Sequence, residues 1–152
     1  LGLRTEPLAR RDFEQQFGVA VVEVGLLLHP DQPWLCGSPD GIFKFIDETC
    51  LLEVKCPYKC KDKKILDASG QSIVRYLQCA DNKIMLKESH RYYTQVQILL
   101  YLLNARECFF FVYSSKQNIT VRVAKDDAFL QQAVPALEDF YFKWFLPALA
   151  KQ

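Results

Sequence analysis

The feature that most constrains the fold is a helix predicted over residues 90–105, HRYYTQVQILLYLLNA. In its second half, apolar residues lie on most sides of the helix, which leaves no face suited to water. We therefore expect this helix to be buried against a β-sheet. Strand-like runs at 107–113 and 119–123 follow it, joined by a polar turn, and would supply part of that sheet.

Other segments extend this pattern to a complete domain. Two strand-like runs, IFKFI at 42–46 and CLLEVKC at 50–56, are expected to pair as a hairpin. The order helix, three strands, helix, strands and helix predicts an α/β fold, and the length suits one domain over residues 1–152. The first of the three strands is expected over 19–28, and Pro135 is expected to kink or divide the last helix.

Composition narrows the class of protein. The formal net charge is +1, so the chain lacks the strongly basic balance that marks many nucleic-acid-binding proteins, and local charge must be considered instead. No apolar run approaches the roughly 18 residues of a membrane span, so we expect no membrane partner. The chain opens at Leu1 and its one methionine is Met85, so we expect it to be a segment with a cropped N-terminus.

The six cysteines leave two interpretations open. A zinc site can be drawn from Cys56, Cys60, Cys79 and His90, although no paired, closely spaced motif supports it. Reduced thiols in an intracellular protein are the default expectation. The expected compartment is the nucleus if the source is eukaryotic and the cytoplasm otherwise.

The segment GSPDG at 37–41 has the chemistry of a type I turn. Its Asp40 is either a solvated turn residue or a functional carboxylate. With a three- or four-residue loop at 46–49, the hairpin register places residues 40–42 opposite 53–56. Asp40 then lies within about 7–8 Å of the charged side chains of the facing strand, on a diagonal.

Those charged side chains belong to Glu53 and Lys55, which share one face of their strand because side chains alternate. Alone, the pair is typical of a solvated face with a weak ion pair. Together with Asp40 it supplies two carboxylates and a lysine, a set that suits Mg²⁺. A metal held there can polarise a phosphoryl oxygen and lower the pKa of a bound water, while Lys55 orients that water or offsets developing charge.

Polar side chains also lie at the start of the apolar helix. Tyr92 and Gln95 are three residues apart and share a face, which favours contact with phosphate and water. Gln97 has two interpretations of similar weight: a role in function, or an amide that bonds to nearby backbone or water.

The segment KCPYKCKDKK at 55–64 holds five lysines directly after the charged pair. Such runs are usually solvated surface, but a polyanion lying across the site would meet this one. We therefore expect DNA contacts from this segment. The residues concerned are Lys59, Lys61, Lys63 and Lys64.

Several motifs together resemble a known family. Pro39-Asp40 followed by Glu53-x-Lys55 resembles the P-D…(D/E)-x-K signature, and TEPLAR, GSPDGI, LLEVKCPY and YYTQVQ occur in that order. The combination resembles the YqaJ-type, lambda-exonuclease-like viral recombinase family of the PD-(D/E)XK nuclease superfamily. The resemblance runs from about Thr5 through the last helix. It implies a restriction-endonuclease-like α/β core, with a mixed central β-sheet flanked by helices.

The resemblance also implies an activity, because such proteins are Mg²⁺-dependent deoxyribonucleases. By matching motif positions, Asp40 and Glu53 would be metal ligands, joined by the backbone carbonyl of Val54. Lys55 would position or activate the water. Mn²⁺ is a possible substitute for Mg²⁺.

Further residues follow from the same resemblance. Gln95 matches the family glutamine near the scissile phosphate, Tyr92 an aromatic residue beside it, and Glu6 a first-helix glutamate near the metal. For Glu6, a carboxylate favoured at a helix N-terminus is nearly as good an explanation. Ile98 stands where many relatives have glycine, and the insert at 65–88 is longer than in the phage enzyme, which leaves directionality and oligomeric state open.

Three functional hypotheses result. The first is a DNA exonuclease, with 5′-to-3′ polarity and double-stranded ends as its substrate, in which a metal-activated water attacks the phosphodiester in line. The second is an endonuclease with the same residues. The third is a catalytically silent DNA-binding module, although the complete set of Asp40, Glu53 and Lys55 argues against it. A homo-oligomer is possible under each.

Overall fold

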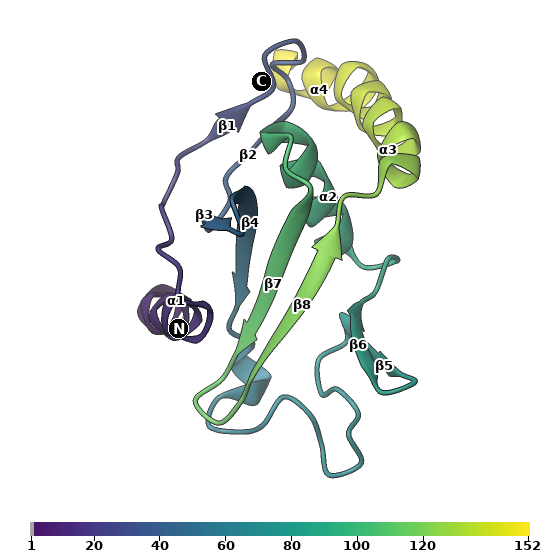
Figure 1. The fold of residues 1–152 in the computed structure, drawn as a ribbon. Helices are drawn as coiled ribbons and strands as arrows, with labels where there is room; N and C mark the ends of the chain where they lie inside the picture. The colour runs from purple at the N-terminus through teal and green to yellow at the C-terminus, as the bar shows by residue number, and fades with distance from the viewer. Residues whose placement is uncertain (1) are drawn as a thin grey trace.

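The computed structural model describes the backbone of residues 2–152 and the side chains of residues 5–152. It is a mixed α/β arrangement in which a central sheet has helices on both faces (Figure 1). The elements in chain order are α1 (Gly2–Phe17), β1 (Leu27–Leu28), β2 (Cys36–Gly37), β3 (Gly41–Phe45), β4 (Glu48–Lys55), the 3₁₀ turn η1 (Tyr58–Cys60), β5 (Leu77–Ala80), β6 (Lys83–Leu86), α2 (Arg91–Leu103), β7 (Glu107–Tyr113), β8 (Asn118–Ala124), α3 (Asp127–Phe140), the π-helical segment η2 (Tyr141–Phe145) and α4 (Leu146–Ala150).

The central sheet has four strands in the order β3-β4-β7-β8. The β3–β4 and β7–β8 pairs are antiparallel, whereas β4 and β7 are parallel and are connected through α2. The predicted mixed sheet is therefore confirmed. Two short antiparallel pairs, β1–β2 and β5–β6, lie outside this sheet.

Each face of the sheet carries its own hydrophobic core. On the α1 face, Phe13 is fully buried against aromatic side chains that include Phe109. On the other face, Leu100 of α2 is buried with residues such as Leu51 and Phe110. Burying one such side chain stabilises the fold by about 1.5–3 kcal/mol. The expected burial of the 90–105 helix against a sheet is thus confirmed.

Expectations about one strand and about the last helix are wrong. Residues 19–26 form an extended strap instead of a strand, with a single bridge between Val22 and Ile42, and only Leu27–Leu28 pairs further along. The strap runs along the outer edge of β3, where no further strand among the described residues lies beside it. Val22 is therefore left exposed. Of the two outcomes expected at Pro135, division of the helix is wrong: α3 continues through Pro135 to Phe140, since the fixed φ of proline is compatible with a helix. The helix becomes π-helical at Tyr141.

No helix among residues 2–152 is both long enough and apolar enough to cross a membrane. The C-terminal helical segments instead expose several large apolar side chains, among them Trp144, which is 68% exposed.

Gly41 begins β3 at the point where the strap passes along the edge of that strand. A Cβ at this position would lie 2.3 Å from Cγ1 of Val21 and 3.4 Å from the carbonyl oxygen of Val22. The glycine therefore permits a close approach that holds the segment before β3 in place. Its neighbour in the chain is Asp40, which forms a bend between β2 and β3 in place of the predicted type I turn.

Gly41→Ala is expected to lower the free energy of unfolding by about 1–3 kcal/mol, because the stiff Val21 side chain and the strap must shift. Denaturant unfolding of the variant beside wild type measures this. Gly25→Ala is the matched control, since a Cβ at position 25 meets no atom within 4 Å. An equal effect of the two substitutions would show that the close approach is unimportant.

Candidate active site

The β3–β4 hairpin brings Asp40 and Glu53 together. Its loop is only Ile46-Asp47, with φ values of 49° and 63°, which is shorter than the predicted three or four residues. The pairing of Gly41 with Leu52 therefore places Asp40 opposite Glu53. The backbone N–H of Asp40 donates to Oε1 of Glu53 at 3.2 Å. Asp40 thus lies directly opposite Glu53 and not on the expected diagonal.

The Asp40 carboxylate is also fixed by the facing strand. Its Oδ2 accepts a hydrogen bond from the backbone N–H of Val54 at 2.7 Å. This bond is short, and it orients the carboxylate toward the C-terminal end of β4, where Lys55 follows.

Glu53 is an unusually buried acid, with 2% of its surface exposed. Burial first, and then the negative charge of Asp40, raise the pKa of its carboxyl to about 8, while Lys55 opposes the shift. A carboxylate pair in such a position is stabilised by added positive charge.

Glu6 joins this pair from α1. Burial, the charge of Asp40 and a side-chain hydrogen bond with Asp40 all raise the pKa of the Glu6 carboxyl. Because α1 begins at Gly2, Glu6 lies past the first turn of the helix. Its contact with Asp40 therefore favours a place for Glu6 at the site over a carboxylate that only stabilises the helix N-terminus.

Lys55 and Tyr92 meet across a pocket. The Lys55 Nζ lies 4.1 Å from the centroid of the Tyr92 ring, which is a cation–π contact. Tyr92 is held at the start of α2, where its N–H donates to Nδ1 of His90 at 3.1 Å. The pocket has a volume of about 200 Å³, and Glu6 and Val54 also line it.

Sequence reasoning missed Tyr76, which lines the same pocket and is 9% exposed. Its hydroxyl has no hydrogen-bond partner among the described residues, and burial raises the pKa of this phenol, so it stays protonated. The ring packs edge-on against Tyr92 at 5.0 Å. Tyr76 comes from the 65–88 insert, where no motif drew attention to it.

The two glutamines of α2 differ in burial and in hydrogen bonding. Gln95 is exposed on the surface of α2, and it is not among the residues that line the pocket. Gln97 is fully buried; its Nε2 donates to the Ala124 carbonyl at 2.9 Å, and its Oε1 accepts from the Asp126 N–H at 2.8 Å. The interpretation of Gln97 as an amide bonded to nearby backbone is confirmed.

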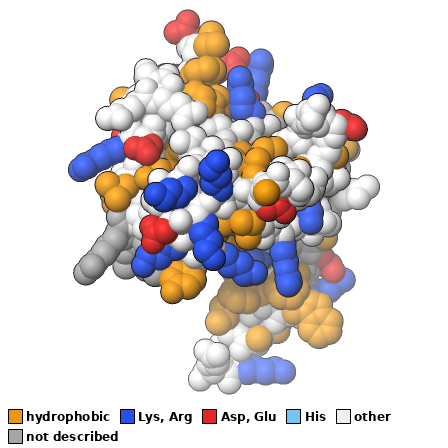
Figure 2. Space-filling model, turned by 90° about the horizontal axis from the view of Figure 1, so that it is seen from below, with side chains coloured by type: hydrophobic (Ala, Val, Ile, Leu, Met, Phe, Trp, Pro, Cys, Tyr) orange, Lys and Arg blue, Asp and Glu red, His pale blue; other side chains and the backbone are white. Residues whose placement is uncertain are grey.

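The lysine segment after β4 is exposed but anchored. Ser114 Oγ donates to the Lys63 carbonyl at 2.6 Å, and Gln117 Oε1 accepts from the Ile65 and Leu66 N–H groups. The turn between β7 and β8 therefore holds this loop in place. On the face seen from below, Lys and Arg side chains gather across the middle of the surface (Figure 2). The exposed lysines of the segment are Lys59, Lys61, Lys63 and Lys64.

The donor set decides which metal the site suits. Among residues with described side chains, no group of three or more His, Cys, Asp or Glu is arranged to hold a metal ion. The six cysteines are free thiols. Asp40, Glu53 and the Val54 carbonyl are hard oxygen donors, and Mg²⁺ commonly takes one or two protein carboxylates with water and phosphate completing the shell. The residues present therefore fit Mg²⁺.

Fold and sequence comparisons define the class of the chain. The fold is similar to that of the alkaline exonuclease LHK-Exo from Laribacter hongkongensis, with a TM-score of 0.63 and 24% identity over 98% of this chain and 72% of that one. A complex of LHK-Exo with dAMP matches equally well. The chain thus has the fold of an alkaline exonuclease.

The chain belongs to the YqaJ-like viral recombinase domain family, which it matches over residues 1–106. The family resemblance seen in the motifs is confirmed. The alkaline nuclease of Orgyia pseudotsugata multicapsid polyhedrosis virus is 26% identical over 113 residues, which are 65% of this chain and 27% of that protein. The chain therefore spans about a quarter of the length of this curated relative.

Proposed function

We propose that the chain is a divalent-metal-dependent DNA exonuclease, a phosphodiester hydrolase that uses Mg²⁺ or, in its place, Mn²⁺. The observation that carries the proposal is the meeting of Asp40 and Glu53 at the hairpin end, next to a pocket lined by Lys55. Together with Lys55, the pair resembles the active-site signature of a PD-(D/E)XK core, which supports the proposal. The names of its relatives, an alkaline nuclease and an alkaline exonuclease, support this class of activity.

In this proposal Asp40, Glu53 and the Val54 carbonyl would hold the cation, which when bound would polarise a phosphoryl oxygen and lower the pKa of a water. Lys55 positions that water and offsets charge that develops on the phosphate. Glu6, hydrogen-bonded to Asp40, steadies the carboxylate pair. Tyr92 holds Lys55 over the pocket through its ring.

The remaining roles concern the DNA. Gln95 would contact the scissile phosphate. Because Gln95 is exposed on α2 and does not line the pocket, the DNA would have to extend over that helix to meet it. The lysines of the anchored loop would bind the DNA backbone, since each phosphate contact releases counterions. We propose double-stranded ends as the substrate and 5′-to-3′ as the polarity, by analogy with recombinase nucleases.

The test compares linear duplex DNA with closed-circular DNA, each incubated with the protein in Mg²⁺ and in EDTA. Loss of linear DNA alone, only in Mg²⁺, is the expected result for an exonuclease. Nicking of circles would instead assign an endonuclease. Binding without cleavage in either Mg²⁺ or Mn²⁺ would assign a silent DNA-binding module and contradict the proposal.

A further inference from the structure

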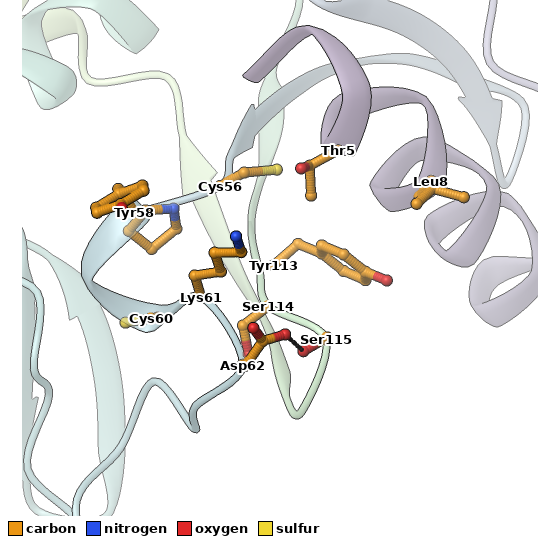
Figure 3. A pocket seen from close by; sticks show the side chains of 11 residues that line it. Thr5, Leu8, Cys56, Tyr58, Cys60, Lys61, Asp62, Tyr113, Ser114 and Ser115 are labelled. Carbon is orange, nitrogen blue, oxygen red and sulfur yellow. Dashed lines mark hydrogen bonds between the residues drawn. The ribbon is translucent and has the colours of Figure 1, made fainter. Parts of the chain in front are cut away.

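A second pocket lies beside the candidate active site. It has a volume of about 200 Å³, and it shares Cys56 and Pro57 with the pocket lined by Lys55. Its other walls come from α1, η1 and the turn between β7 and β8 (Figure 3). The two pockets are thus neighbours on either side of the segment that leaves β4.

This pocket is built from segments that are bonded to one another. Ser115 Oγ donates to Asp62 Oδ1 at 3.1 Å, and Ser114 Oγ donates to the Lys63 carbonyl at 2.6 Å. These bonds hold the loop after η1 against the β7–β8 turn. The pocket is therefore formed before any ligand arrives, which lowers the entropic cost of binding.

Two tyrosines give the pocket aromatic surfaces. Tyr58 is 72% exposed, so the ring is open to a ligand that enters the pocket. Tyr113 is fixed: its ring centroid lies 6.2 Å from that of Phe111, and its hydroxyl bonds to Asp12. In Figure 3 the side chains of Cys56 and Lys61 lie between the two rings.

We propose that this pocket takes a nucleobase of the DNA strand being cut, from a nucleotide next to the scissile phosphate. The inference rests on the proposed nuclease function. Flat aromatic and apolar walls suit any base, because every base has a π-face. Lys61, an exposed residue that lines the pocket, suits the phosphate that follows the base. The wall shared with the active-site pocket keeps the base close to the phosphate that is cut.

A base must leave the duplex stack to enter such a pocket. That step costs a few kcal/mol and is easiest where pairing is weakest, as at a strand end. A base pocket beside the metal site would thus favour DNA ends. It would accept any sequence, because stacking uses the face of the base and makes no base-specific hydrogen bonds.

The experiment measures binding of the protein, in EDTA, to duplexes that carry one abasic nucleotide at successive positions from the end of the cut strand. We expect affinity to fall about 5- to 150-fold at one position or two adjacent positions. Tyr58→Ala should weaken binding of the intact duplex by a similar factor and abolish that position dependence. Tyr58→Phe, which keeps the aromatic ring, should bind the intact duplex as wild type does and should show the same position dependence. Trp144→Ala, an exposed aromatic of similar exposure on η2, should change neither.

A flat abasic profile, no binding of the duplex, or a profile that survives in Tyr58→Ala would each overturn the inference. Cleavage of the intact duplex in Mg²⁺ is measured with the same proteins. If wild type cuts DNA but the profile is flat, the base pocket alone is wrong. If wild type does not cut, the nuclease function itself is wrong.

Discussion

Asp40→Asn is expected to remove DNA cleavage while the fold is preserved. An asparagine Oδ1 can still accept the hydrogen bond from the Val54 N–H, so the hairpin end keeps its geometry. The substitution removes a negative charge from the pair that would hold the cation. Losing several kcal/mol of transition-state stabilisation corresponds to a fall in rate of about 10³-fold or more.

Rates of linear DNA loss in Mg²⁺ measure this effect, with circular dichroism as the check on folding. Asp47→Asn is the matched control, because Asp47 lies in the exposed loop at the opposite end of the same hairpin. The account is contradicted if Asp40→Asn retains the wild-type rate, or if both substitutions slow cleavage equally.

Glu53→Gln is expected to stabilise the metal-free protein and to remove cleavage. The carboxyl of Glu53 is buried beside Asp40, and its pKa is raised to about 8 from 4.5. A neutral amide of the same shape avoids the cost of the buried charge and can still accept from the Asp40 N–H. Around pH 8 and above, the free energy of unfolding of Glu53→Gln should therefore be a few kcal/mol higher than that of wild type.

The sign of the pH dependence follows from the raised pKa. The folded state holds a proton on Glu53 more tightly than the unfolded state does, so this group favours folding below about pH 4.5. That contribution is lost as the pH rises toward about 8. Urea unfolding in EDTA should therefore show wild type losing stability over this range relative to Glu53→Gln. Glu48→Gln, at an exposed site on the same strand, should follow wild type. Parallel curves for wild type and Glu53→Gln would contradict the raised pKa.

Local patterns predicted the hairpin and the burial of α2. Strand alternation alone puts Leu52 and Val54 on one face, suited to a core, and Glu53 on the other; the structure shows that this core is the one against α1. The loop length was wrong because Ile46-Asp47 adopts positive φ at both residues, which neither residue type favours strongly.

Other features depend on tertiary contacts that no local pattern encodes. The strap at 19–26 has strand-like composition but only one bridge to β3, since the rest of the sheet lies on the other side of that strand. Tyr76 reaches its pocket from a turn before β5, and Tyr58 from the short 3₁₀ turn η1, neither of which has a sequence pattern that marks a site. Gln97 appeared as a functional candidate, and only the fold shows that it joins α2 to the end of β8.

The central claim is that Asp40 and Glu53 form a divalent-cation site on which DNA cleavage depends. Calorimetric titration of Mn²⁺ into wild type, Asp40→Asn and Glu53→Gln tests it most directly. The account predicts binding to wild type that is lost or greatly weakened in both variants, with Asp47→Asn unchanged. Wild-type binding that persists in both variants, or no binding to wild type, would contradict it.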